Sequence, residues 1–182
     1  MAAGSASRFG ENKLMAELDG KSLVHRALDA VPTEKFHCVH VVTQYPKIAE
    51  LALKYGFEPV VNHEPQLGLS HTIALGLKSL PQVDAALFMV ADQPCLRRES
   101  VAHLIEFYLG DPDSIAAVGH DGRHGNPCLF PARFFPELLE LQGDQGGAAV
   151  IRRHRDLLRI MEIDSRQLED VDTPRQLRIL QK

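Results

Sequence analysis

Three groups of polar residues in this 182-residue chain have the types and spacing needed to hold phosphates and a metal ion. The first group lies in the segment 2–13, where Gly4 and Gly10 permit tight turns and Arg8 and Lys13 supply positive charge. Backbone N–H groups in such a glycine-rich segment can face phosphate oxygens. The segment is therefore typical of a loop that holds a triphosphate, although a mobile glycine- and serine-rich terminus remains the alternative.

Asp92 is the second group, and it directly follows the most apolar run of the chain, Ala85–Ala91. A continuous apolar run predicts a central strand that is buried on both faces. Ligands of open α/β sheets bind outside the carboxyl ends of the strands, so a carboxylate at this point is well placed to hold a divalent cation. The alternative is a helix cap, but the next helix is expected to begin only near Arg97 or Arg98.

The third group is Asp170 and Asp172, which precede a helix expected over Thr173–Gln181. Both side chains would lie on one face of an extended segment. One of them, reaching the cation beside Asp92 from a second strand, would complete a two-carboxylate site. Such a site suits Mg²⁺, which binds few protein carboxylates and takes other ligands from phosphates and water. Both aspartates also favour the start of the helix electrostatically, and this structural role stays open.

The elements that must position these residues follow from the alternation of short apolar runs with longer helical patterns. Strands are expected at 38–43, 58–62, 85–91, 114–119, 125–130 and 158–163. Helices are expected at 21–31, 46–55, 69–80, 98–109, 131–142, 145–155 and 173–181. Asp121-Gly122 is typical of a hairpin turn and predicts an antiparallel pair. We therefore expect one α/β domain over residues 1–182, with a single mixed sheet between helices.

The composition excludes several classes of function. A formal net charge of −4 argues against a nucleic-acid-binding protein. No apolar run has membrane-spanning length and no signal-peptide core is present, so we expect a cytoplasmic protein. Three widely spaced cysteines indicate neither a disulfide framework nor a zinc site.

Residues 1–13 read Met-Ala-Ala-Gly-Ser-Ala-Ser-Arg-Phe-Gly-Glu-Asn-Lys and resemble the signature loop of the MobA-like nucleotidyltransferases. Further landmarks of that family follow in the same order: Gly68-Leu69-Ser70, Asp92-Gln93-Pro94, Gly125-Asn126-Pro127, Gly143-Asp144-Gln145-Gly146 and Asp170-Val171-Asp172-Thr173-Pro174. The Ala-Ala-Gly form is most similar to the molybdenum cofactor cytidylyltransferase branch. The resemblance implies a Rossmann-like (GT-A-like) three-layer α/β sandwich, with a mostly parallel mixed sheet that carries an antiparallel hairpin.

The resemblance also implies a role for individual residues. The nucleotide is expected at Ala2, Ala3, Gly4, Ser5, Arg8, Lys13, Gly68, Ser70 and Asp92, of which Arg8, Lys13 and Asp92 would act in catalysis. The acceptor substrate is expected at Asn126 and Asp144. Mg²⁺ is expected at Asp92 and Asp172, with Asp170 the less favoured second ligand. Ser70 is in addition a natural N-cap for the helix that follows it.

The implied reaction is transfer of CMP from CTP to the phosphate of molybdopterin or of the molybdenum cofactor, with release of pyrophosphate. A phosphate monoester is largely ionised at neutral pH, so this acceptor needs no general base. Neutralisation of charge and alignment of the reacting groups are then the main requirements. The alternatives are a related transferase that uses GTP or a sugar-phosphate acceptor, and a non-catalytic carrier of the pterin cofactor for a molybdenum hydroxylase.

Two departures from the family pattern bear on these expectations. The family's loop follows a buried first strand, whereas here almost nothing precedes the loop. We therefore expect either a start assigned too late or the loss of that strand. Gly147 and Ala148 stand where the family often has an arginine, although Arg152 and Arg153 follow a turn later. Both departures favour the carrier alternative, and the retained charged residues oppose it.

Overall fold

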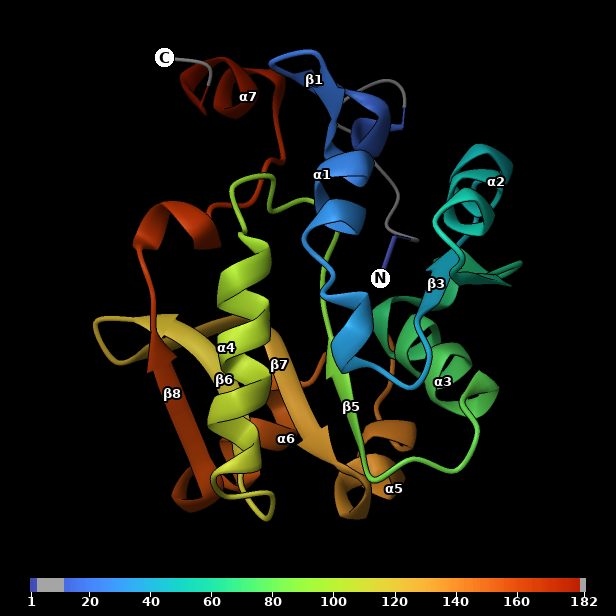
Figure 1. Ribbon diagram of the computed structural model, residues 1–182. Helices are drawn as coiled ribbons and strands as arrows, with labels where there is room; N and C mark the ends of the chain where they lie inside the picture. The colour runs from blue at the N-terminus through green and yellow to red at the C-terminus, as the bar shows by residue number, and fades with distance from the viewer. Residues whose placement is uncertain (3–11, 181–182) are drawn as a thin grey trace.

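The computed structural model describes residues 1–2 and 12–180, whose strands and helices alternate along most of the chain (Figure 1). The strands are β1 (Glu17–Leu18), β2 (Lys21–Ser22), β3 (His40–Thr43), β4 (Glu58–Val61), β5 (Ala85–Phe88), β6 (Ile115–His120), β7 (Arg123–Pro131) and β8 (Leu158–Glu162). The helices are α1 (Leu23–Asp29), α2 (Pro46–Lys54), α3 (Leu69–Ser79), α4 (Arg98–Leu109), α5 (Phe135–Leu139), α6 (Ala148–Arg153) and α7 (Pro174–Leu180). The expected α/β class is confirmed.

The longer strands form two separate groups. β3 and β4 pair in parallel, and the second group has the order β5-β7-β6-β8. In that group β7 is antiparallel to both of its neighbours, whereas β6 and β8 are parallel. The expectation of a single sheet is wrong for the described residues, because no strand among them joins β3 to β5. Only Ala2 extends the first group in that direction, through a parallel bridge to Thr43.

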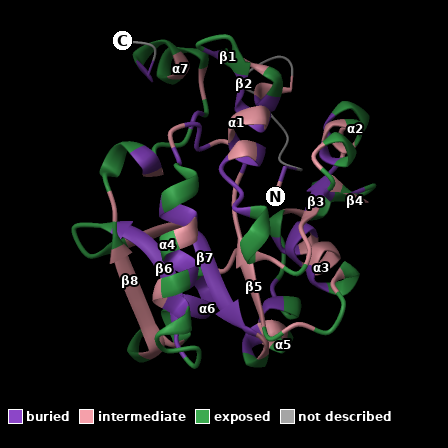
Figure 2. Cartoon of the chain, viewed as in Figure 1, coloured by how far each residue is buried: buried purple, intermediate pink, exposed green. Residues whose placement is uncertain are grey.

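β5 is shorter and less buried than its apolar sequence predicts. It spans only Ala85–Phe88, and all four of these residues are half-buried, whereas β6 and much of β7 are buried (Figure 2). One edge of β5 pairs with β7, and the other has no partner strand among the described residues. The prediction of a fully buried central strand over Ala85–Ala91 is therefore wrong here. An apolar run indicates that its side chains pack in a core, but it does not indicate whether a neighbouring strand is present.

Helices cover both faces of the four-stranded sheet, with α4 on one face and α6 on the other (Figure 1). Leu104, Ile105 and Tyr108 of α4 pack on β6 and β7. Phe130 of β7 lies in the core on the opposite face, among buried residues of α3, α5 and α6. Among residues 1–2 and 12–180, no helix is long and apolar enough to cross a membrane.

The expected hairpin is present between β6 and β7. Asp121 and Gly122 have φ values of 49° and 71°, as a two-residue turn with two left-handed positions requires. Both carboxylate oxygens of Glu162 accept from this turn, each at 3.0 Å from one of the two backbone nitrogens. The turn is thus held to β8, and β7 is fixed in the direction that carries Asn126 toward the cavity described below.

Candidate active site

Lys13 connects the two acidic positions that the sequence singled out. Its Nζ donates to Oδ2 of Asp92 at 2.7 Å and to Oδ1 of Asp172 at 2.8 Å. Lys13 begins a short 3₁₀ helix, which Asn12 caps by accepting from the backbone N–H of Leu14 at 3.1 Å. The local turn therefore directs the ammonium group between two carboxylates that are distant from it in sequence.

The electrostatics of this group are dominated by negative charge. Partial burial opposes the charge of Lys13, but hydrogen bonds to Asp172 and Asp92 outweigh it and raise the pKa of the ammonium above its usual value. Burial and the nearby Asp92 carboxylate raise the pKa of Asp170. Lys13 therefore stays protonated at neutral pH and offsets part of the repulsion among three acidic side chains.

Backbone and amide hydrogen bonds hold the two acidic segments together. The N–H of Val171 donates to the carbonyl of Asp92 at 2.9 Å. Gln93 Nε2 donates to the carbonyl of Leu168 at 3.3 Å. The Asp172 N–H donates to Oε1 of Gln176 at 3.0 Å, at the start of α7. Gln93 and Gln176 are positioning residues to which the sequence analysis gave no role, because an amide side chain gives no pattern that reveals its partner.

Gly68 and Gly143 bring two other predicted loops into contact. Gly68 has φ +88°, and a Cβ at this position would lie 2.4 Å from the carbonyl oxygen of Gly143. The N–H of Ser70 donates to the same oxygen at 3.0 Å. Ser70 is buried within the first turn of α3, and Gly68 occupies the N-cap position without a side-chain hydrogen bond. The expected N-cap role of Ser70 is therefore wrong. Gly68 is the N-cap residue, and the N–H of Ser70 bonds to the Gly143 loop that packs against it.

Asn126 and Asp144, the two residues expected at the acceptor, line one cavity of about 640 Å³, which we call the Asn126 cavity. Arg152 and His124 line it as well. Burial and the charges of Arg152 and Arg155 lower the pKa of His124, so this imidazole is neutral at neutral pH. Arg152 provides a cation one turn further along α6 than Gly147 and Ala148, where the family often has an arginine. His124 is a lining residue that the sequence analysis did not predict at the site.

A covalent role for the cysteine in this cavity is disfavoured by its ionisation. Cys128 lines the Asn126 cavity, and burial raises the pKa of its thiol to about 12. The thiolate, not the thiol, is the nucleophile, so Cys128 is unreactive at neutral pH. The side chain instead donates to Oδ1 of Asn126 at 3.3 Å and so helps to orient that amide.

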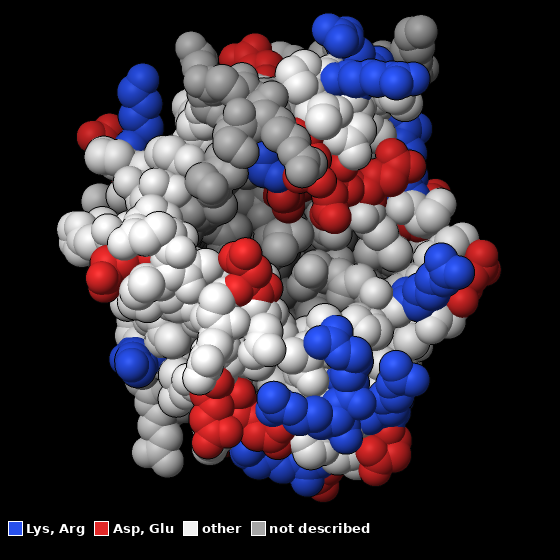
Figure 3. Space-filling model, turned by 180° about the vertical axis from the view of Figure 1, so that it is seen from behind, with Lys and Arg blue, Asp and Glu red and all other residues white. Residues whose placement is uncertain are grey.

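The predicted residues thus fall into two neighbouring groups. Lys13, Asp92 and Asp172 form one, and Asn126 and Asp144 lie in the cavity. The segment that follows β5 connects the groups, because Val90 lines the cavity and Asp92 follows two residues later. Acidic and basic side chains face each other across the centre of the back face of the molecule (Figure 3).

Five other residues were expected at the nucleotide, and only one of them, Ala2, lies among the residues that the structure describes. Ala2 is buried at 3% exposure, and its N–H donates to Val42 at 2.9 Å, so it is part of the sheet rather than of an open surface. Ala3, Gly4, Ser5 and Arg8 lie outside the described residues.

An α/β fold that holds a lysine between two carboxylates, next to a small-molecule cavity, has groups that can bind a phosphorylated substrate. The family model of the MobA-like NTP transferase domain matches residues 1–157, and the chain belongs to this family. It is accordingly a nucleotidyltransferase.

The chain is also similar to three known proteins. It is 27% identical to the purine catabolism protein PucB of Bacillus subtilis (strain 168), over 96% of this chain and 90% of that protein. A CMP:2-keto-3-deoxy-manno-octonic acid synthetase, solved in complex with CTP, superposes with a TM-score of 0.76 at 14% identity, over 99% and 94% of the two chains. Rv0371C from Mycobacterium tuberculosis H37Rv, solved with manganese, gives a TM-score of 0.73 at 20% identity, over 98% and 94%. The two structures establish the shared fold.

Proposed function

We propose that this nucleotidyltransferase transfers CMP from CTP to the phosphate of molybdopterin or of the molybdenum cofactor, and that pyrophosphate leaves. The observation that carries the proposal is the contact of one ammonium group, Lys13, with both Asp92 and Asp172. Phosphoryl chemistry of this kind depends on cations held where negative charge accumulates. The Asn126 cavity lies within the size range of small-molecule sites, which supports an acceptor of about the size of a pterin.

The acidic pair fits a divalent cation. Both carboxylates reach one point, since both contact the same Lys13 nitrogen. Among the described residues no group of three or more His, Cys, Asp and Glu side chains is arranged as a metal site. A site of two carboxylates suits Mg²⁺, which completes its shell with phosphate oxygens and water. The manganese in the structure of Rv0371C supports a divalent cation in this fold. Bound there, Mg²⁺ would neutralise phosphate charge.

The side chains of the chain supply the remaining tasks. Lys13 would stabilise charge on the α-phosphate and on the departing pyrophosphate. Asn126 and Arg152 would orient the acceptor, the amide through hydrogen bonds and the guanidinium through its charge. The acceptor phosphate, ionised at neutral pH, would attack the α-phosphorus: one P–O bond forms and the bond to pyrophosphate breaks. No residue has to remove a proton, which agrees with the protonated thiol of Cys128.

The choice of CTP and of a pterin acceptor rests on similarity. The sequence has the Ala-Ala-Gly form of the cytidylyltransferase branch, and the synthetase of similar fold was solved with CTP. That synthetase is named for a sugar acid, so a sugar-type acceptor is the main competitor.

The deciding experiment measures pyrophosphate release by the purified chain with Mg²⁺. Each of CTP, GTP, ATP and UTP is combined with molybdopterin, with molybdenum cofactor and with a set of sugar phosphates. We expect release only with CTP and a pterin acceptor. Release with a sugar phosphate and not with a pterin would replace the proposed acceptor. Tight binding of the pterin with no release under any nucleotide would instead identify a carrier, whose partner would be a molybdenum hydroxylase.

A further inference from the structure

The segment between β8 and α7 contacts both groups of the candidate site. After β8 the chain passes the end of α4 at which that helix begins, and then continues to α7 (Figure 1). The segment contains a short 3₁₀ helix, Ser165–Leu168, and then reaches Asp172, the second carboxylate beside Lys13. We call residues 165–172 the strap. Its contacts decide where the Asp172 carboxylate is held.

Gln167 fixes the strap to the beginning of α4. It is buried, at 6% exposure, and its Oε1 accepts from Ser100 Oγ at 2.7 Å and from the N–H of Arg97 at 3.1 Å. A buried amide oxygen with two donors is held firmly, because breaking the contact would leave buried polar groups unpaired. The strap is therefore anchored to a helix that packs in the core.

Two further hydrogen bonds connect the strap to the segment that carries Asp92. The N–H of Val171 donates to the carbonyl of Asp92 at 2.9 Å, and the carbonyl of Leu168 accepts from Nε2 of Gln93 at 3.3 Å. Val171 is also fully buried. Because Asp172 is the next residue, these bonds place its carboxylate relative to that of Asp92.

Leu168 also connects the strap to β7. A Cβ on Gly125 would lie 3.2 Å from Cδ2 of Leu168, so the leucine side chain lies directly against the backbone of this glycine. Leu168 packs in the same cluster as Leu129 of β7 and Leu104 of α4. Residues 125 and 129 share one face of β7, whereas Asn126 belongs to the opposite face. The strap thus supports β7 from behind the residue that lines the Asn126 cavity.

One leucine therefore contacts the surroundings of both groups. Its carbonyl bonds to Gln93, next to Asp92, and its side chain supports Gly125, next to Asn126. A close-packed protein interior has few voids, so it transmits a displacement instead of absorbing it. A shift of Leu168 would consequently change the distance between the amide in the cavity and the carboxylates.

We propose that Leu168 is a positioning residue that sets where Asn126 lies relative to Asp92 and Asp172. The inference rests on the proposed function, in which an acceptor held at Asn126 must bring its phosphate to a nucleotide beside the two carboxylates. A misplacement of about 1 Å can lower a rate about 10²-fold. Leu168 does not line the Asn126 cavity, so it acts through the residues that it contacts.

The test is a double-mutant cycle across the contact of Leu168 with Gly125. Leu168→Ala removes the support of β7, and Gly125→Ala adds a methyl group that presses on the leucine. Gly125 has no positive φ, so the effect of the methyl group comes from this contact. Each single variant should lower kcat about tenfold and leave KM for the nucleotide unchanged. In the double variant the methyl group occupies part of the space that the leucine leaves, so most of the loss should be recovered.

A second readout needs no substrate. Hydrogen exchange of the Val171 N–H, measured by NMR, reports on its bond to the carbonyl of Asp92. The N–H of Ile163 is the reference, because it bonds to Gly119 ahead of the strap. Each single variant should speed exchange at Val171 at least about fivefold relative to Ile163, and the double variant should reverse the change.

Two controls separate positioning from a general loss of stability. Leu168→Met keeps the volume of the side chain and should retain nearly normal kcat and exchange. Leu158→Ala truncates another half-buried leucine, at the other end of β8 from the strap. It should lower the free energy of unfolding and change neither kcat nor the exchange of Val171 relative to Ile163.

Additive losses in the double variant, or normal kcat and normal Val171 exchange in Leu168→Ala, would overturn the proposal. An effect of Leu158→Ala on Val171 exchange as large as that of Leu168→Ala would overturn it as well. If the unmodified protein releases no pyrophosphate with any acceptor, the proposed function fails by itself. The exchange of Val171 in the four variants then still decides whether Leu168 positions the strap at Asp92.

Discussion

Lys13 and Asp92 lie 79 positions apart in sequence, yet the Lys13 Nζ is 2.7 Å from Asp92 Oδ2. The contact joins the end of the glycine-rich segment near the beginning of the chain to the segment that follows β5. Asp172 completes the group from a third segment. Side-chain exposure is only 15% for Lys13 and 23% for Asp92, so the interaction is less screened by solvent than a surface ion pair.

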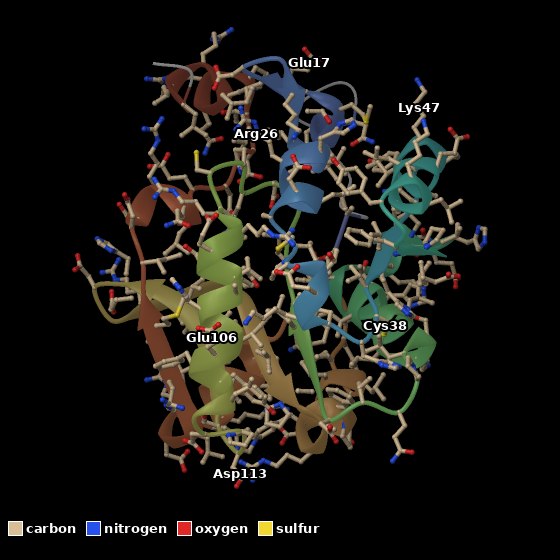
Figure 4. All side chains as sticks on the ribbon, viewed as in Figure 1. Glu17, Arg26, Cys38, Lys47, Glu106 and Asp113 are labelled. Carbon is tan, nitrogen blue, oxygen red and sulfur yellow. The ribbon has the colours of Figure 1, made fainter. Side chains whose placement is uncertain are left out.

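Lys13→Ala should lower kcat by about 10²–10³-fold at saturating nucleotide and Mg²⁺, as removal of one preorganised donor does at other charged transition states. Lys13→Arg should retain part of the activity, because it keeps the charge but changes the geometry. Lys47→Ala on the exposed face of α2 is the matched control (Figure 4). Pyrophosphate release measures all three variants. Normal turnover by Lys13→Ala would remove this lysine from the mechanism.

Asp92→Asn and Asp172→Asn should each raise, by about tenfold or more, the Mg²⁺ concentration needed for half-maximal activity, because each removes one of two anionic oxygen donors. Asp170→Asn should have a smaller effect, since only Asp92 and Asp172 contact Lys13. Metal titrations of pyrophosphate release compare the three variants, and EDTA should abolish the activity of the unmodified protein. A larger effect at Asp170 than at Asp172 would reverse the assignment of the second ligand.

Arg152→Ala should raise KM for the acceptor about tenfold and leave KM for the nucleotide unchanged, because Arg152 lines the Asn126 cavity. Arg153→Ala removes the neighbouring positive charge, which instead contacts Glu137 at 3.2 Å, and serves as the control. Initial rates over a matrix of both substrate concentrations separate the two KM values. Equal effects of the two variants would indicate a general loss of positive charge rather than a specific contact.

Gly68→Ala should destabilise the fold by more than Gly56→Ala. Both positions have positive φ, +88° and +75°, and this alone costs an alanine about 1–2 kcal/mol. A Cβ on Gly56 meets nothing within 4 Å, whereas one on Gly68 meets backbone of Gly143 at 2.4 Å and forces the two loops apart. Urea unfolding gives both free energies. Similar losses for the two variants would show that the Gly143 loop moves away freely.

The free energy of unfolding should rise between pH 6 and pH 8 through the Met1 amine. Its pKa is about 6 in the folded protein, against 8.0 as the ordinary value. In this interval the unfolded chain binds more protons than the folded one, so stability increases with pH, by at most about 3 kcal/mol. The nine histidines also titrate here, so the comparison is with N-terminally acetylated protein, in which this contribution is absent. Identical pH profiles for the two forms would contradict the burial of a free amine.

The sequence by itself determined the α/β class, most of the strands and helices, the hairpin turn and the family. These features depend on local periodicity, on turn residues such as Asp121-Gly122, and on the order of short motifs. All three are properties of residues that are close together or ordered in the sequence. Cap positions were less secure: the expected cap at Ser70 depended on residue type, whereas Gly68 occupies that position because another loop packs against it.

Only the tertiary structure decided which charged groups share a site and which strands share a sheet. Lys13 lies between Asp92 and Asp172 because three distant segments meet, and His124 of β7 lines the Asn126 cavity together with Arg152 of α6. The run Ala85–Ala91 gave the same apolar pattern that a fully paired central strand would give. Its side chains pack on helices, while one backbone edge of β5 has no partner strand among the described residues. Hydrophobicity records the environment of side chains, and hydrogen bonding between strands is a property of backbone groups that every residue but proline carries alike.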